Sequence, residues 1–235
     1  MRERGHEQRA RPYGRVRAKW KAADIDPGPT VSGMEVDMST KWISMLALLF
    51  LNAVPVACLS ADPATVPEIK RTALGLYLTA EEAYEMVQAD PASTLFVDVR
   101  SIGEVQFLGM PTMADANVPY MLQSEWNEWD EARSNFKFVV NAGFADELAR
   151  RLAAKGLQRT DPVILMCRSG DRSAKAADLL AQLGYAKVYS MIDGFEGDLA
   201  KDGPDTGRRT VNGWKNANLP WSYTLDHAKM YNPEK

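Results

Sequence analysis

The residues best suited to chemistry lie in one short loop, Cys167-Arg-Ser-Gly-Asp-Arg172. The loop follows a short apolar run and precedes a stretch of helical periodicity. A cysteine at such a junction can act as a sulfur nucleophile, because the free N–H groups and the dipole at a helix start favour an anion. Arg168 and Arg172 add positive charges that favour the thiolate over the thiol. The sequence therefore predicts Cys167 as the nucleophile, with Arg168 and Arg172 as electrostatic stabilisers.

Each of these residues also has an ordinary structural explanation. A free cysteine is often a small buried apolar residue, the two arginines could be solvated residues at a helix start, and Gly170 could belong to a common turn. Their joint occurrence favours the chemical interpretation. Gly170 suits a loop that wraps its backbone around a centre, because glycine adopts φ values that are barred to other residues.

The elements that position this loop are predicted as alternating strands and helices. Thr79-Ala-Glu-Glu82 has the pattern of a capping box that opens the first helix. Strands are expected at 76–78, 94–99, 162–166 and 187–191, with later helices at 145–155 and 173–183. This order predicts right-handed βαβ units, and hence a single α/β domain whose doubly wound parallel sheet is flanked by helices. Such sheets bind ligands beyond the carboxyl ends of their strands, where Cys167 is expected.

The composition excludes several classes of protein. The chain has 235 residues, a 46% hydrophobic content and a formal net charge of -3, which rule out global disorder and give no sign of a nucleic-acid partner. Two cysteines cannot form a disulfide scaffold, and two histidines make a His-rich metal centre implausible. We expect neither a metal nor an organic cofactor.

The N-terminal region has the composition of a targeting segment. Residues 1–37 form a basic extension, which would not be translated if synthesis starts at Met38. Residues 38–61 combine a short positive leader, the apolar run 43–51 and a small-residue exit, which is the pattern of a signal peptide. Cleavage would leave a periplasmic or secreted protein without a stable membrane anchor; the alternative is an uncleaved N-terminal anchor.

Export would change the chemistry available to the chain. It would remove Cys58, whose surroundings match a lipoprotein site poorly, and leave Cys167 as the only thiol of an acidic protein. Residues 62–73 are predicted as a linker because of their prolines.

The loop and its flanking motifs resemble a known family. Asp98-Val-Arg100 and Glu104 upstream and Asp193-Gly-Phe-Glu-Gly197 downstream are similar to the corresponding motifs of single-domain rhodaneses, the thiosulfate or persulfide sulfurtransferases. The resemblance covers about 74–197, and the segment 214–220 is similar to the closing Trp and Leu-Pro element of that family. It implies a rhodanese-like domain over 74–220, followed by a C-terminal tail at 221–235.

The resemblance also implies roles for individual residues. Cys167 would receive a sulfane sulfur as a persulfide, and a second nucleophile, an unidentified thiol or protein, would remove it. Asp98 and Arg100 would support the active loop, although an ordinary surface ion pair is an equal alternative. The residues implied to bind the substrate are Arg168, Ser169, Gly170, Asp171, Arg172 and Ser173.

The length of the loop distinguishes sulfur transfer from phosphate chemistry. Phosphatases with a related loop place an arginine six positions after the cysteine, whereas here Arg172 lies at five and Ser173 at six. The smaller ring suits a sulfur atom better than a phosphoryl group. Two arginines in the loop also suit an anionic donor such as thiosulfate, because guanidinium groups offer paired donors to oxyanions.

The sequence departs from the family in three places. The usual histidine before Asn117-Val-Pro119 is absent, and insertions are predicted at 121–136 and 198–213. Trp126 and Trp129 in the first insertion are interpreted as core cover, with a docking surface as the alternative. Two hypotheses follow: an exported sulfurtransferase, or a non-catalytic persulfide carrier that serves one partner through the Trp-rich insertion.

Overall fold

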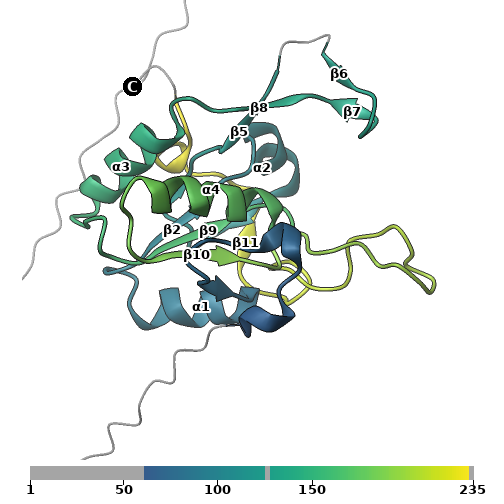
Figure 1. Ribbon diagram of the computed structural model, residues 1–235, viewed down its shortest axis with the longest axis horizontal. Helices are drawn as coiled ribbons and strands as arrows, with labels where there is room; N and C mark the ends of the chain where they lie inside the picture. The colour runs from purple at the N-terminus through teal and green to yellow at the C-terminus, as the bar shows by residue number, and fades with distance from the viewer. Residues whose placement is uncertain (1–60, 125–127, 233–235) are drawn as a thin grey trace, which may run out of the picture. The chain divides into compact units, whose positions relative to one another are not determined.

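The computed structural model describes residues 61–124 and 128–232, which form a central parallel sheet with helices on both faces (Figure 1). The strand order is β1-β10-β9-β2-β4. Val163 of β9 is in register with Leu95 of β2 on one side and Val188 of β10 on the other. The strands are β1 (Tyr77–Leu78), β2 (Leu95–Asp98), β4 (Ala116–Asn117), β9 (Val163–Met166) and β10 (Val188–Met191).

Two apolar cores form because the central strands β2 and β9 are buried at every position and are apolar except for Asp98. Successive side chains point to opposite faces of the sheet, so Leu165 and Cys167 belong to one core and Ile164 and Met166 to the other. Helices α3 (Phe144–Ala154) and α4 (Asp171–Gln182) cover the first core. Helices α1 (Ala80–Ala89) and α2 (Ile102–Leu108) cover the second, where the buried Trp214 also packs.

The predicted parallel α/β fold is confirmed, including the capping box of α1 between Thr79 and Glu82. Two elements differ from the prediction. Helix α4 begins at Asp171, within the loop, because Gly170 adopts a left-handed conformation that starts the helix two residues earlier. Helix α2 was not predicted, although Ser101 and Glu104 form a second capping box at its start.

Two extensions leave the central fold. The first is an arm of two antiparallel ribbons, which projects beyond the helical layer (Figure 1). Its strands are β5 (Met121–Gln123), β6 (Trp129–Asp130), β7 (Asn135–Phe136) and β8 (Phe138–Val140). The second extension, 198–213, is closed by a single bridge between Leu199 and Arg209.

The two ends of the described chain pack onto the domain. Residues 62–73, predicted as a linker, contain the short 3-10 helices η1 (Pro63–Thr65) and η2 (Glu68–Lys70), and Val66 and Lys70 are buried. In the predicted tail, β11 (Trp221–Ser222) pairs with β3 (Met110–Pro111), and η3 (His227–Lys229) follows.

The basic extension, Trp126 and nearly all of the predicted signal peptide lie outside the described residues, which start at Ala61. Within 61–124 and 128–232, no helix has the length and apolarity needed to cross a membrane.

Candidate functional site

Cys167 directly follows β9, the middle strand of the sheet. Its Sγ accepts a hydrogen bond from the amide of Gly170 at 3.1 Å. The Ser173 hydroxyl is the second donor within reach, and its one proton can go to Sγ at 3.6 Å or to the Gly170 carbonyl oxygen at 3.0 Å. The Ser173 hydroxyl in turn accepts a hydrogen bond from Ser190 at 3.1 Å. Donors converge on the sulfur, so the site suits a negatively charged sulfur atom.

Only 1% of Cys167 is exposed, although it lines a cleft of about 450 Å³. The sulfur therefore lies at the floor of this cleft, and a reacting group must enter through the opening. One wall is the loop 167–172 with Lys175 of α4, and the other is the arm. The predicted insertion 121–136 thus lies beside the predicted loop.

A second segment, 192–197, supports the loop from behind. The amide of Phe195 donates to the Cys167 carbonyl at 2.8 Å, and the amide of Glu196 donates to the Arg168 carbonyl at 3.0 Å. The approach is close: a Cβ on Gly170 would lie 2.3 Å from the Ile192 carbonyl oxygen. The downstream motif that resembles the rhodaneses therefore fixes the backbone of the loop.

Gly194→Ala should destabilise the protein by about 2–4 kcal/mol, because its φ is +69° and the new Cβ would lie 2.3 Å from the Arg168 carbonyl carbon. Gly184→Ala is the matched control, since its φ is +84° but no heavy atom lies within 4 Å of the added carbon. That change should cost only about 1–2 kcal/mol. Urea unfolding of both variants tests this expectation, and equal losses would contradict the close approach at Gly194.

Arg172 is held by Glu104 and does not project freely into the cleft. Its Nη1 donates to Glu104 Oε2 at 2.7 Å and its Nη2 to Oε1 at 2.5 Å. Burial works to raise the pKa of Glu104, but the hydrogen bonds and charge of Arg172 outweigh it and lower the pKa to about 2. Burial likewise works to lower the pKa of Arg172, but Glu104 and the charge of Cys167 raise it. Arg172 therefore remains a cation, anchored beside the sulfur.

The Glu104–Arg172 pair should make the free energy of unfolding depend on pH in the acidic range. The folded pKa of Glu104, about 2, lies below its ordinary value of 4.5, so the stabilisation is complete above pH 4.5 and is lost as the pH falls toward 2. The loss should be at most about 3 kcal/mol, since both side chains are mostly buried. The difference in unfolding free energy between wild type and Glu104→Gln should shrink across this window. A difference that is constant with pH would argue against the pair.

Asp98 and Arg100 form a buried ion pair beneath the loop. Both side chains are fully buried, and Arg100 Nε donates to Asp98 Oδ1 at 2.9 Å and Nη2 to Oδ2 at 2.5 Å. The guanidinium also lies 3.9 Å from the centre of the Phe195 ring. The alternative of a surface ion pair is therefore wrong: the pair lies in the core and contacts the residue whose amide binds the Cys167 carbonyl.

The other predicted loop residues differ in exposure. Ser173 is buried, and Arg168 is exposed and forms no ion pair with any residue of 61–124 or 128–232. Arg209, which was not predicted as a site residue, lies in the second extension and donates to the Gly197 carbonyl at 2.5 Å. Burial and then the charge of Arg168 lower the pKa of Arg209. The two guanidiniums therefore add positive charge beside the loop.

Two residues that sequence reasoning missed hold the supporting segment in place. Lys70 is buried, and its Nζ donates to the Ile192 carbonyl at 2.9 Å and to Asp198 at 2.7 Å. Lys70 lies in a segment that the prolines marked as a linker, and no local pattern links it to Asp198. Across the described ranges, no group of three or more His, Cys, Asp and Glu side chains could hold a metal ion.

The fold and the site define a single-domain α/β protein with a free, buried cysteine in the loop that follows the middle strand, at the carboxyl edge of a parallel sheet. The profile of the family described as Rhodanese-like domain matches residues 79–201, and the chain belongs to this family. The resemblance noted from the sequence is confirmed.

Three relatives illustrate the similarity. An uncharacterized protein of Rickettsia rickettsii is 30% identical over 146 residues, which cover 62% of this chain and 96% of that protein. The thiosulfate sulfurtransferase GlpE of Tolumonas auensis is 44% identical over 41 residues, 17% of this chain and 39% of its own length. The crystal structure of Rv0390 from M. tuberculosis is 29% identical with a TM-score of 0.44, and the match covers 63% of this chain and 96% of that one.

Proposed function

We propose that this protein is a sulfurtransferase that carries a sulfane sulfur as a persulfide on Cys167. Membership of the rhodanese-like family supports sulfur transfer in general. The observation that carries the persulfide proposal is the pair of donors at the sulfur: the Gly170 amide donates to Sγ, and the Ser173 hydroxyl lies within hydrogen-bond reach of it. Such donors stabilise a negatively charged sulfur before and after it accepts a second one.

The reaction consists of two displacements at sulfur. The Cys167 thiolate attacks the sulfane sulfur of thiosulfate, the sulfur–sulfur bond of the donor breaks, and its electron pair leaves with sulfite. An acceptor nucleophile then attacks the outer sulfur of the Cys167 persulfide, and the electron pair of the broken bond returns to Cys167. Covalent catalysis of this kind divides one transfer into two easier steps.

The position of Ser173 favours sulfur over phosphate as the transferred group. It occupies the sixth position after Cys167, and its hydroxyl turns inward to the sulfur. Arg172, at the fifth position, is engaged with both carboxylate oxygens of Glu104. Ser173 carries no charge and Arg172 is bound to Glu104, so neither side chain is free to neutralise a phosphoryl group. The loop therefore suits a single sulfur atom.

An anionic donor of the thiosulfate class suits the charge around the loop. Arg168 is exposed without an ion-pair partner in the described part of the chain. Arg209 lies close enough for the charge of Arg168 to lower its pKa. Guanidinium groups bind oxyanions through paired donors. The Tolumonas auensis relative is named as a thiosulfate sulfurtransferase, which gives additional support to this donor.

Incubation with thiosulfate tests the proposal directly. The intact protein should gain the mass of one sulfur atom and release one equivalent of sulfite, and peptide mapping should place the sulfur on Cys167. Prior alkylation of Cys167 should block both results. If sulfite is not released and the mass does not change in the absence of reducing agents, the proposed function is wrong.

We also propose that the protein is exported, on the basis of the signal-peptide pattern at 38–61. The N-terminal mass of the protein recovered from the periplasm or the medium tests this proposal. A mature N-terminus near residue 61 is expected, whereas an intact N-terminus on membrane-bound protein would indicate an anchor.

A further inference from the structure

The cleft above Cys167 is much larger than a small donor requires. Its volume is about 450 Å³. Volumes of roughly 300–1,000 Å³ are typical of sites for organic ligands. The thiosulfate of the proposed first step would occupy only a small part of it, so the remaining space is available to the acceptor.

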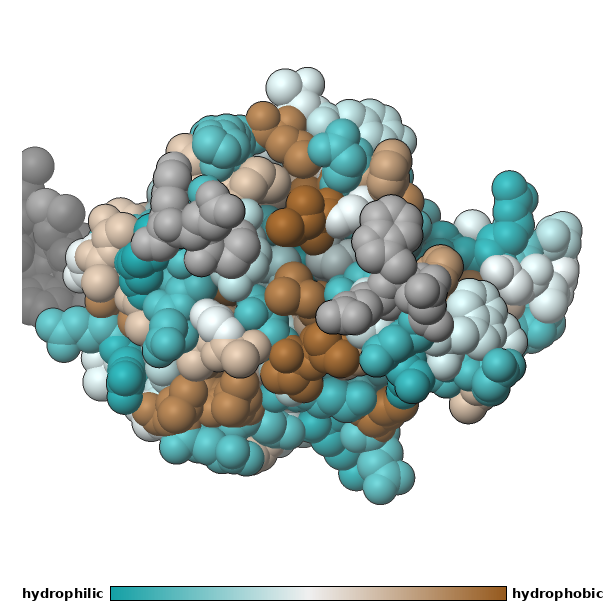
Figure 2. All heavy atoms as spheres, turned by 90° about the horizontal axis from the view of Figure 1, so that it is seen from above, coloured by the Kyte–Doolittle hydropathy of each residue, from teal (hydrophilic) through white to brown (hydrophobic). Residues whose placement is uncertain are grey.

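The wall opposite Cys167 is carried by the arm and combines three apolar side chains with the polar side chains of Gln123, Asp130, Arg133 and Asn135. Met121, Phe136 and Phe138 line the cleft, and Phe136 and Phe138 are exposed. The Phe136 ring packs edge-on against Trp129 at 5.3 Å, so it has a fixed orientation. Two-stranded ribbons are marginally stable in water, and exposed apolar patches of this kind mark partner surfaces. Figure 2, which shows the molecule from above, also reveals a band of apolar residues near the middle of that face.

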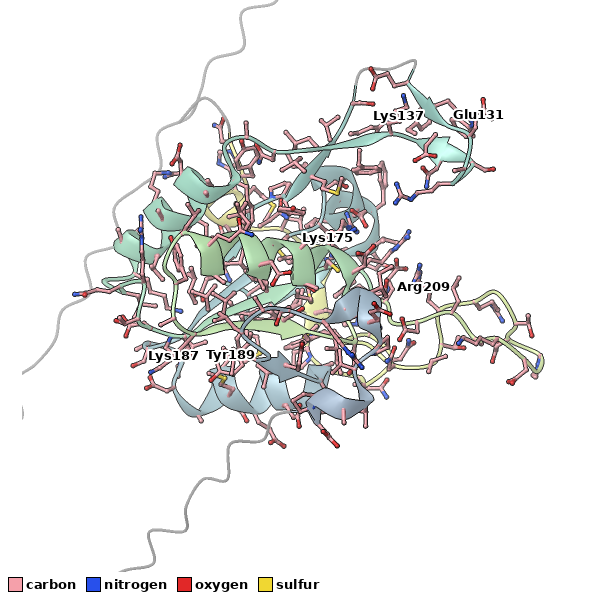
Figure 3. The ribbon with its side chains drawn as sticks, viewed as in Figure 1. Glu131, Lys137, Lys175, Lys187, Tyr189 and Arg209 are labelled. Atoms are coloured by element: carbon pink, nitrogen blue, oxygen red, sulfur yellow. The ribbon has the colours of Figure 1, made fainter. Side chains whose placement is uncertain are left out.

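The charged residues around the cleft determine which charge on an acceptor is favoured. Six of the charged residues that line the cleft are paired with one another, so their charges cancel. The pairs are Arg172–Glu104, Lys175–Asp171 and Arg133–Asp130. Arg168, which lines the cleft, is left without an ion pair among the described residues, whereas Arg209 lies outside the lining, near Arg168 and near the carboxylates of Glu196 and Asp198. Figure 3 shows Lys175 on α4 and Arg209 in the second extension, both below the arm that carries Lys137 and Glu131. The net charge presented to an incoming group is therefore positive.

We infer that the cleft between the arm and the loop 167–172 is a docking groove for a protein acceptor, an exposed segment with a cysteine, an adjoining apolar side chain and flanking acidic residues. The inference rests on the proposed sulfur transfer. The apolar side chain packs on Phe136 and Phe138, the acidic residues lie near Arg168 and Arg209, and the cysteine reaches the floor. Its thiolate attacks the outer sulfur of the Cys167 persulfide, the bond to Cys167 breaks, and Cys167 regains its thiolate as the acceptor leaves as a persulfide.

Three synthetic peptides with one central cysteine test this inference. The first has leucine beside the cysteine and glutamates at both ends, the second has serine in place of the leucine, and the third has lysines in place of the glutamates. With persulfidated protein, the rate of sulfur transfer per unit concentration should be about tenfold higher for the first peptide than for the second. It should also exceed that for the third, and the excess should shrink as salt is added.

Substitutions in the arm test whether the preference for the first peptide arises at the cleft. Phe138→Ser should reduce the ratio of peptide transfer to cyanide turnover by about tenfold. Val139→Ser is the matched control, because the next residue of β8 points to the opposite face and does not line the cleft. It should keep the wild-type ratio. If all three peptides react alike, or if Phe138→Ser and Val139→Ser give the same ratio, the docking groove is refuted.

Binding of the first peptide with its cysteine replaced by serine separates this inference from the proposed function. Fluorescence anisotropy should show that the labelled peptide binds wild type and Val139→Ser more tightly than Phe138→Ser. This result would stand even if thiosulfate failed to load Cys167, in which case only the proposed transfer would be wrong. Sulfur loading without any peptide binding would overturn the docking groove and leave the transfer intact.

Discussion

Cys167→Ser is expected to abolish sulfur transfer from thiosulfate to cyanide, because a serine hydroxyl is neither ionised at neutral pH nor able to form a persulfide. The remaining site would keep its donors: the Gly170 amide and the Ser173 hydroxyl would face an oxygen instead of sulfur. Donors that stabilise a charge cannot replace the atom that carries it. Thiocyanate formation, followed over time, should fall to the uncatalysed rate.

The matched control for this variant is Cys58→Ser, which removes the other cysteine of the chain. Cys58→Ser should form thiocyanate at the wild-type rate, and Cys167→Ser should unfold at nearly the wild-type urea concentration, since serine is smaller and can accept the same amide hydrogen. If thiocyanate formation persisted in Cys167→Ser and disappeared in Cys58→Ser, the reactive sulfur would have been assigned to the wrong cysteine.

A smaller effect is expected from the hydroxyl groups behind the sulfur. Ser173 contacts Sγ and accepts a hydrogen bond from Ser190, and all three residues are buried. Removing one donor to a developing charge lowers rates by about 10²–10³-fold where that donor is essential. The Gly170 amide remains in Ser173→Ala, so the loss caused by a missing hydroxyl should lie well below the loss in Cys167→Ser.

The sequence was sufficient to predict the core of the fold and the position of the cysteine. A continuous apolar run as short as 163–166 favours a buried strand because it is too short for a helix. The capping box at Thr79 marks a helix start from four residues alone. These signals are local, so a single sequence contains them. Helix α2 escaped prediction because its seven residues include only one that is buried, Val105.

The partners of the site residues could not be predicted, because they are set by packing between distant segments. Glu104 and Arg172 are 68 positions apart, and Lys70 and Asp198 are 128 apart. The sequence marks each as a charged residue but does not say which opposite charge it meets. The same holds for the arm, since residues 121–136 were recognised as unusual but their approach to Cys167 depends on how the β5–β8 ribbon leaves the domain.

The second large effect concerns stability. Asp98→Ala should destabilise the protein by about 3–5 kcal/mol, because it leaves the charge of Arg100 buried without its carboxylate partner. The remaining interactions of Arg100, a hydrogen bond to the Gly109 carbonyl at 2.7 Å and the contact with Phe195, cannot neutralise a full charge in the core. Urea unfolding at neutral pH measures the loss.

Asp205→Ala provides a control with the same chemistry at the surface. Asp205 pairs with Arg208 at 3.0 Å, and the side chains are 45% and 73% exposed, so the change should cost about 1 kcal/mol or less. The contrast separates burial of the charge from loss of the carboxylate itself. Asp98→Ala should also slow persulfide formation, because Arg100 packs on Phe195, whose amide holds the Cys167 carbonyl at 2.8 Å. Equal losses in the two variants would mean that water reaches Arg100 and that the loop does not depend on the buried pair.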